Sequence, residues 1–445
     1  MKYICPLFLI LLIIFTSCED DSIENPGKKP STFSVRIDNV IHSACLDEYP
    51  QGPSHYIPYL VMSNLPENEK ILEFGEYYSP ENPDPDESDY AVILDYSDYE
   101  LFQEWDWTQE LIHSIVPLDQ LIPNKTYYLK GVVKTNKGTY YSNVVKINTE
   151  NLPDYKPDPQ ARELPVVFHV MPYEDGTYPH TYFFDEMLAC ANRIYRNAWS
   201  LPELADSGIK FVPATHTPDG APLSTPGIHY LSKREILDYS KFGEEDLRFL
   251  DNNIWNMTEV INVWICPFTN NFDENEGNNI AGFSFFPFFN SEETLQGCDT
   301  IKADDFSGIF INQTECVGNG YSAGGVVIFA HEVGHYLGLE HVFEEDWCDD
   351  TPEYDREKYI VEQLYPYIDA TLRYPIDTSI KPYTAINIMD YSYVIYAGIT
   401  PQQAERIRYT LQHAYLIPGG KPLPAPVKSG GNPDAATKFS PRKIH

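Results

Sequence analysis

The sequence predicts a multidomain chain, with an N-terminal β-sandwich followed by an α/β domain. Within residues 32–150, stretches such as Phe33–Ile37 alternate apolar and polar side chains, which is typical of strands with one buried face. Residues 151–163 contain Pro153, Pro157 and Pro159, which indicates a stiff linker. From residue 164 to 418, strand-like apolar runs alternate with helical patterns, which favours a mostly parallel sheet.

The N-terminal domain carries a hairpin signal and a second, more specific pattern. Two strand-like runs, 128–133 and 140–145, flank the turn residues Asn136-Lys137-Gly138. Leu118, Leu121, Pro123 and Tyr127 resemble the corner before the sixth strand of fibronectin type III domains, where a tyrosine hydroxyl holds the backbone. The resemblance implies a fibronectin type III-like β-sandwich over residues 32–150. Its role stays open between a spacer or docking module and a binder of a specific glycan or protein.

In the second domain, the pattern predicts a strand at 166–170, a helix at 185–198, and strands near 209, 261, 281 and 308. Thr400 and Pro401 are suited to the cap and first position of the last helix. Gly419-Gly420 is expected to end the fold. Residues 419–445 are rich in Pro, Gly and Lys, which predicts a disordered tail.

The N-terminus reads as a targeting segment. Leu7–Phe15 is almost wholly apolar but too short to span a bilayer as a mature helix. Phe15-Thr16-Ser17-Cys18 resembles a bacterial lipobox, so residues 1–17 are predicted to be a lipoprotein signal peptide, Cys18 the lipidated residue and 18–31 a tether. The acidic Glu19–Asp21 resembles the surface-export signal of Bacteroides-type lipoproteins. We therefore expect a membrane-anchored, surface-exposed outer-membrane lipoprotein; the alternative is an ordinary secretory peptide with an incidental Cys18.

The charge balance limits the classes of partner that the chain is expected to bind. The chain has 31 Lys and Arg against 66 Asp and Glu, a net charge of −35, which argues against nucleic acid because phosphate contacts need clustered cations. Acidic loops such as 83–89 and 344–346 are read as solvated surface. Their oxygen ligands make Ca²⁺ binding a hypothesis, although EF-hand spacing is absent. The oligomeric state stays unknown.

The chain has eight cysteines, of which Cys5 would leave with the signal and Cys18 would be acylated. Cys190 and Cys266 lie in apolar helix and strand patterns and are read as buried thiols. Three others flank the histidine-rich segment 331–341 and supply the better disulfide candidates: Cys298, Cys316 and Cys348. Cys45 raises the hypothesis of a thiolate that blocks the metal in a latent form.

The most specific motif is His331-Glu332-Val333-Gly334-His335-Tyr336-Leu337-Gly338-Leu339-Glu340-His341, an H-E-x-x-H-x-x-G-x-x-H pattern. On a helix, His331 and His335 project from one face. Gly338 suits the end of that helix, so the chain reverses and His341 returns as third ligand. Three histidines leave one position open for water, which indicates a catalytic Zn²⁺. Glu332 would act as general base on that water.

Downstream, Asn387-Ile388-Met389-Asp390-Tyr391 resembles the Met-turn of metzincins. The resemblance implies that Met389 packs beneath the zinc histidines and that Tyr391 approaches the metal or the substrate oxyanion. Together with strand-like segments at 164–170, 208–212, 261–264 and 280–287, these residues make the region about 164–418 resemble the pappalysin family of metzincin zinc proteases. The whole chain also resembles metzincin-like lipoproteins of Bacteroides-type bacteria. By that resemblance, the strand near 280–288 is the antiparallel edge strand over the cleft.

Two departures limit the resemblance. Pappalysins usually carry more cysteines after the Met-turn, and residues 392–396 have none. The segment of about 353–385 looks specific to this chain, so the family's substrate preference is not carried over.

The predicted function is a zinc metalloendopeptidase that cleaves extracellular proteins or peptides with water activated by Glu332. One alternative is a catalytically idle surface binding lipoprotein with a metzincin fold, and another is a zinc hydrolase of non-peptide amides. Four further histidines are predicted to be structural or on the surface: His169, His216, His229 and His413.

Overall fold

The computed structural model describes residues 33–44, 54–95, 105–114, 118, 121–149, 160–237, 253–268, 280–302, 305–316, 324–356, 359, 371–391 and 394–421. The predicted signal peptide, the lipidation site Cys18, the tether and Cys45 lie outside these residues, as do residues 151–159 of the predicted linker and residues 422–445 of the predicted tail. The described residues form two compact units, one up to residue 149 and the other from residue 160. Within the described parts of the chain, no helix has the length and apolar character needed to cross a membrane.

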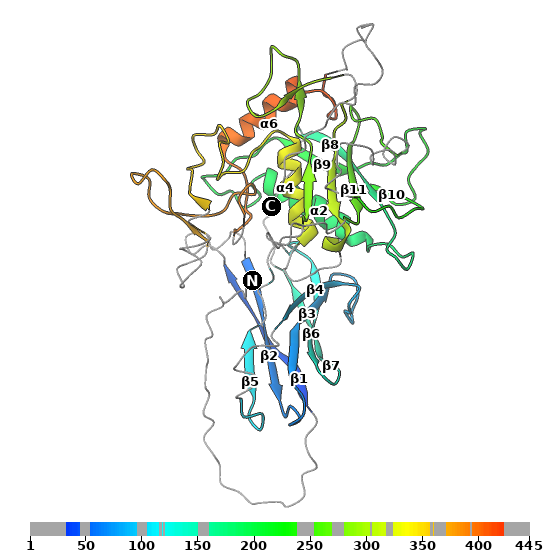
Figure 1. Ribbon diagram of the computed structural model, residues 1–445, viewed down its shortest axis with the longest axis vertical. Helices are drawn as coiled ribbons and strands as arrows, with labels where there is room; N and C mark the ends of the chain where they lie inside the picture. Colours follow the sequence, from blue (N-terminus) through cyan, green and yellow to red (C-terminus); the bar gives the residue numbers. More distant parts are fainter. Residues whose placement is uncertain are drawn as a thin grey trace, which may run out of the picture. The chain divides into compact units, whose positions relative to one another are not determined.

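The first unit consists of two antiparallel sheets. Its strands are β1 (Ser34–Ala44), β2 (Ser54–Ser63), β3 (Ile71–Ser79), β4 (Tyr90–Asp95), β5 (Leu111–Ser114), β6 (Thr126–Thr135) and β7 (Thr139–Asn148). One sheet has the order β1-β2-β5 and the other β4-β3-β6-β7 (Figure 1). Asn143 of β7 accepts a hydrogen bond from the backbone of Ile37 on β1, and the Leu60 side chain of β2 lies against Gly131 of β6. The two sheets are therefore in contact.

The corner before β6 is held by a tyrosine. The hydroxyl of Tyr127, which is fully buried, accepts a hydrogen bond from the backbone N–H of Ile122 at 3.0 Å. This is the contact that the sequence pattern around Leu118 and Tyr127 predicts.

The second unit is built on a six-stranded sheet. Its strands are β8 (Arg162–Val170), β9 (Ile209–Pro213), β10 (Ile228–Tyr230), β11 (Ile261–Cys266), β12 (Gly282–Ser284) and β15 (Ile309–Asn312), in the order β10-β8-β11-β15-β12 with β9 also paired to β8. All pairs are parallel except β12 with β15. The strands expected near 209, 261, 281 and 308 are thus present, and β12 has the expected antiparallel edge position.

The sheet is buried by helices and loops. All six residues of β11 are buried, as a central parallel strand requires. Helices α2 (Thr181–Tyr195) and α4 (Gly324–Tyr336) lie side by side (Figure 1). Helix α2 also contacts β9, and α4 contacts β12 and β15. Helix α4, which carries the zinc motif, therefore packs against the edge strand β12 and its neighbour β15.

Short elements complete the unit. These are the 3-10 turn η2 (Gln313–Cys316), the pairs β13 (Phe288–Phe289) with β14 (Asp299–Thr300) and β16 (Leu372–Arg373) with β17 (Tyr383–Thr384), and helix α6 (Pro401–His413). Thr400 caps α6, with Pro401 at the start, as predicted, and Gln403 completes a capping box.

Two histidines that look unrelated in sequence meet inside the sheet. His169 of β8 is fully buried, with Nδ1 2.9 Å from Nδ1 of His229 on β10 and Nε2 2.9 Å from Asn262 Oδ1 on β11. Burial lowers the pKa of His169 to about 3, so its ring is neutral and serves a structural role, as predicted.

The disulfide expectation is wrong for two of its cysteines. Cys316 and Cys348 are both buried free thiols. Burial raises the pKa of each thiol, to about 12 for Cys348, so neither is a reactive thiolate at neutral pH. Cys266 is a buried free thiol, as predicted.

Candidate active site

The zinc motif spans the end of α4 and the turn that follows it. His331, Glu332 and His335 lie on the last turns of the helix, where the preceding apolar run is buried. Gly338 has a φ of +91°, the left-handed conformation that ends helices. The N–H of Gly338 bonds to the carbonyl of His335, and that of Leu339 bonds to the carbonyl of Gly334, both at 2.9 Å. This closing motif turns the chain sharply and brings His341 back toward the helix.

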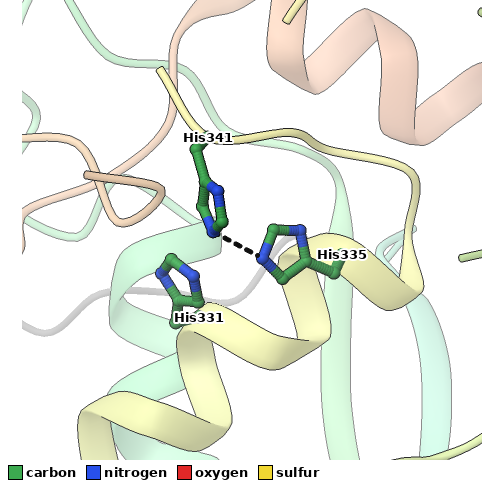
Figure 2. A group of neighbouring side chains, drawn as sticks. All are labelled: His331, His335 and His341. Carbon is green, nitrogen blue, oxygen red and sulfur yellow. Dashed lines mark hydrogen bonds between the residues drawn. The ribbon is translucent and has the colours of Figure 1, made fainter. Parts of the chain in front are cut away.

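The three histidine rings converge (Figure 2). One ligand atom from each of His331, His335 and His341 lies within 4.8 Å of the other two, and all three residues are buried. His335 Nε2 and His341 Nε2 are 3.0 Å apart. This is the cluster that the sequence spacing predicts.

The partners of the Nδ1 atoms decide which nitrogen can bind a metal. His331 Nδ1 lies 2.7 Å from the carbonyl of Ile388, and His335 Nδ1 lies 2.8 Å from the carbonyl of Leu339. His341 Nδ1 lies 3.1 Å from the carboxylate of Glu344. Because these oxygens only accept, each Nδ1 carries the proton and each Nε2 presents a lone pair. Three converging lone pairs repel one another unless a cation lies between them, so the residues fit Zn²⁺.

The protonation states agree with this fit. Burial lowers the pKa of His331 to about 4, and burial together with the charge of its neighbours lowers that of His341. Both rings are therefore neutral at pH 7, which is the form that binds metals. His331 Nε2 is buried without a hydrogen-bond partner among the described residues.

Glu332 is placed beside the histidines and away from water. It is 1% exposed, and its two carboxyl oxygens have no hydrogen-bond partner among the described residues. Burial raises the pKa of Glu332 well above its ordinary value. A Cβ added to Gly282 on the edge strand β12 would lie 3.2 Å from Glu332 Oε1, so the carboxyl lies directly against that strand.

The Met-turn lies beneath the histidines. Met389 is fully buried, and a Cβ at Gly334 would overlap its Sδ atom. Asn387 accepts a hydrogen bond from the Met389 N–H at 2.9 Å, and its side chain also bonds to Gln403, the capping-box residue of α6. The turn is therefore fixed to α4 on one side and to the start of α6 on the other.

Tyr391 reaches the site from the same turn. Its hydroxyl lies 2.7 Å from His341 Nε2, and its ring centre is 4.5 Å from that of His341. Burial raises the pKa of Tyr391, so the hydroxyl keeps its proton at neutral pH. Tyr391 therefore lies beside a predicted zinc ligand, and its role toward the metal or the oxyanion stays a prediction.

The motif did not reveal several residues that support the site. Tyr195 of α2 donates to the carbonyl of Ala330 at 2.9 Å, which holds α2 on the zinc helix. Arg373 of β16 pairs with Asp390 at 3.1 Å and donates to the carbonyl of Tyr391, and Tyr354 donates to the same Asp390 carboxyl. No local sequence pattern marks these residues, because their partners lie far away along the chain.

Comparison with known families assigns the region that holds this geometry. Residues 245–412 match the model of the peptidase M43 family, described as pregnancy-associated plasma protein-A. This region is a pappalysin-family metzincin domain. The match includes the three histidines, Glu332 and the Met-turn, and it makes the chain a metallopeptidase of the metzincin type.

Solved structures add descriptive comparisons. Mature mirolysin of Tannerella forsythia, solved with a cleaved peptide, is 21% identical and has a TM-score of 0.39, covering 56% of this chain and 92% of that one. A promirolysin mutant from the same organism is 21% identical with a TM-score of 0.40, covering 58% and 83%. A DUF3823 family protein of Bacteroides ovatus is 18% identical with a TM-score of 0.20, covering 26% and 56%. No curated protein matches.

Proposed function

We propose that the protein is a zinc-dependent endopeptidase that hydrolyses peptide bonds of extracellular proteins or peptides. The observation that carries this is the convergence of three unprotonated Nε2 atoms beside the buried carboxyl of Glu332. Zn²⁺ bound by His331, His335 and His341 would supply Lewis-acid activation of water and of the substrate carbonyl.

Two side chains have separate roles in this reaction: Glu332 transfers protons, and Tyr391 stabilises the oxyanion. Glu332 accepts the proton of the attacking water and returns it to the leaving amine. Tyr391, which keeps its hydroxyl proton, donates a hydrogen bond to the oxyanion that develops on the carbonyl. The edge strand β12 offers backbone groups to which an extended substrate adds as a further strand. Backbone pairing of this kind makes few demands on substrate sequence.

The idle binding lipoprotein is the less favoured alternative. An idle protein has no need of a general base, whereas here Glu332 is buried beside the histidines without a hydrogen-bond partner among the described residues, which costs free energy. A hydrolase of non-peptide amides would use the same residues. Assays on protein, peptide and small amide substrates distinguish the three functions.

The test is a pair of measurements on Glu332→Ala. The variant keeps all three histidines, so we expect one Zn²⁺ per chain in metal analysis, as in the wild type. Peptide cleavage should fall by about 10²–10⁴-fold, the usual contribution of a placed general base. Unchanged turnover would sink the mechanism. Zn²⁺ that persists in the His331→Ala, His335→Ala double variant would sink the metal site.

The location and the N-terminal unit belong to the same proposal. The chain is a lipoprotein acylated at Cys18 and exposed on the outer membrane, supported by the lipobox-like sequence. Cys18→Ala should abolish labelling by a fatty-acid analogue, and labelling that persists would contradict the anchor.

Residues 32–150 form a fibronectin type III-like module that places the peptidase. Support comes from the Tyr127 corner and the strand orders β1-β2-β5 and β4-β3-β6-β7. Ca²⁺ binding stays a hypothesis for metal analysis of the same samples.

A further inference from the structure

Arg356 lies beside the catalytic histidines without being one of the motif residues. Its guanidinium carbon is 4.8 Å from the ring centre of Tyr391 and 4.9 Å from that of Phe343. Both rings pack on His341, with centre distances of 4.5 Å for Tyr391 and 4.9 Å for Phe343. A single layer of aromatic rings therefore separates the cation of Arg356 from a zinc ligand.

The segment that carries Arg356 is held to the Met-turn by side-chain and backbone contacts. Tyr354, two residues earlier, is buried and donates its hydroxyl to Asp390 of the Met-turn. Its backbone forms a bridge with Pro375. Arg373 stacks on the Tyr354 ring at 5.1 Å. These contacts join the segment to the turn that holds Tyr391, so Arg356 keeps a defined position relative to the site.

The two arginines of this region are in different environments. The guanidinium of Arg373 is fully buried and neutralised by Asp390, which is 1% exposed. It therefore has no free charge to offer a substrate. Arg356 is only partly buried and stacks on ring faces. A stacked guanidinium keeps its N–H groups directed outward in its plane, where they match the two oxygens of a carboxylate.

We propose that Arg356 selects substrates that carry a carboxylate close to the scissile peptide bond, on a Glu or Asp side chain. The inference rests on the proposed peptidase function and specifies its substrate class. The other charges around the site favour the opposite choice, since the carboxylate of Glu344 lies beside His341 and the chain has a net charge of −35. A local, oriented cation is therefore needed if an acidic residue is to be accepted there.

The experiment measures charge preference at each substrate position. Full-length wild type and Arg356→Glu are given matched peptides that carry Glu, Gln or Lys in turn at each position flanking the scissile bond. Wild type should prefer Glu to Gln at one position, and Arg356→Glu should reverse the preference to Lys there. We expect kcat/KM for the Glu peptide to fall by about tenfold or more, the usual scale for a charge-assisted pair. Arg356→Lys should retain a weaker preference for Glu.

Lys381→Glu is the matched control, because it makes the same change in net charge at an exposed position of the 371–391 segment. It should leave the preference unchanged. Equal use of Glu and Gln peptides by wild type at every position would overturn the proposal. So would an equal loss on all peptides in Arg356→Gln, which would mean that Arg356 merely supports Tyr391.

A binding measurement separates this inference from the peptidase function. In the Glu332→Ala background, the affinity for intact Glu and Gln peptides is compared with and without Arg356→Gln. A preference for Glu that disappears with Arg356 supports the carboxylate site, even if the wild type cleaves no peptide and the peptidase function fails. Equal affinities for both peptides would overturn it.

Discussion

Glu76 shows how one residue sets a pH dependence far from the catalytic histidines. It lies on β3 of the first unit, fully buried, and its two carboxyl oxygens have no hydrogen-bond partner in the described part of the chain. Burial therefore raises the pKa of Glu76 well above its ordinary value. The carboxyl folds in its neutral form, whereas in the unfolded chain it ionises near its ordinary pKa of about 4.3.

The sign of the effect follows from proton uptake. Between the unfolded and folded pKa values, the folded state binds one proton more than the unfolded state, so stability falls as pH rises. The contribution of Glu76 is complete below the unfolded pKa and is lost toward the raised folded pKa. Each pH unit in that window costs up to about 1.4 kcal/mol.

We expect Glu76→Gln to remove this loss. Wild type and variant are unfolded with denaturant at about pH 5 and about pH 8, both above the pKa of the carboxyl in the unfolded chain. The wild type should lose more stability between the two pH values, because glutamine has no proton to release. Parallel changes in both proteins would show that Glu76 is not the titrating group.

At the scale of elements, helix α4 packs closely on the Met-turn because Gly334 has no side chain. A Cβ at Gly334 would overlap Met389 Sδ and would lie 2.8 Å from the Tyr195 hydroxyl. Replacing a helical glycine with alanine normally stabilises a helix by about 0.8–1 kcal/mol. Here the overlap outweighs that gain, because overpacking of a filled core costs about 1–3 kcal/mol.

Gly334→Ala should therefore destabilise the protein and weaken its hold on Zn²⁺. The displaced Met389 shifts the Met-turn, whose Ile388 carbonyl orients His331. Thermal unfolding and competition with a chelator measure the two effects. Gly138→Ala, where an added Cβ meets nothing within 4 Å, is the matched control and should be neutral. A Gly334→Ala protein of wild-type stability and zinc affinity would refute the packing argument.

Local patterns predicted the elements well and the contacts between them poorly. The histidine spacing, the Gly338 stop and the Thr400 cap each depend on a few neighbouring residues, and the structure has them as expected. The pairing of Arg373 with Asp390 joins β16 to the Met-turn, and its buried charges have no local signature. The disulfide expectation failed because cysteine spacing says nothing about which thiols meet.

At the scale of the whole molecule, every residue with a catalytic role lies in the second unit. Its ends are tied together at one point. Arg162, at the start of β8, donates to the carbonyls of Leu411 and Pro418, both at 2.7 Å. The backbone of Lys421 still bonds to Ala414. The sequence predicts that this domain ends at residue 418. The hydrogen bond of Lys421 indicates that a folded fragment should extend three residues further, to residue 421.

We therefore expect a fragment of residues 160–421 to fold alone and to cleave generic peptides nearly as well as the chain from residue 18. A fragment that starts at residue 167 should not fold, because it lacks Arg162 and the β8 residues that pair with β9. Both fragments and the longer chain are compared by thermal unfolding and on one peptide with matched Zn²⁺. Much higher activity of the 160–421 fragment would mean that the preceding residues inhibit the peptidase. Failure of that fragment to fold would show that the domains are not independent.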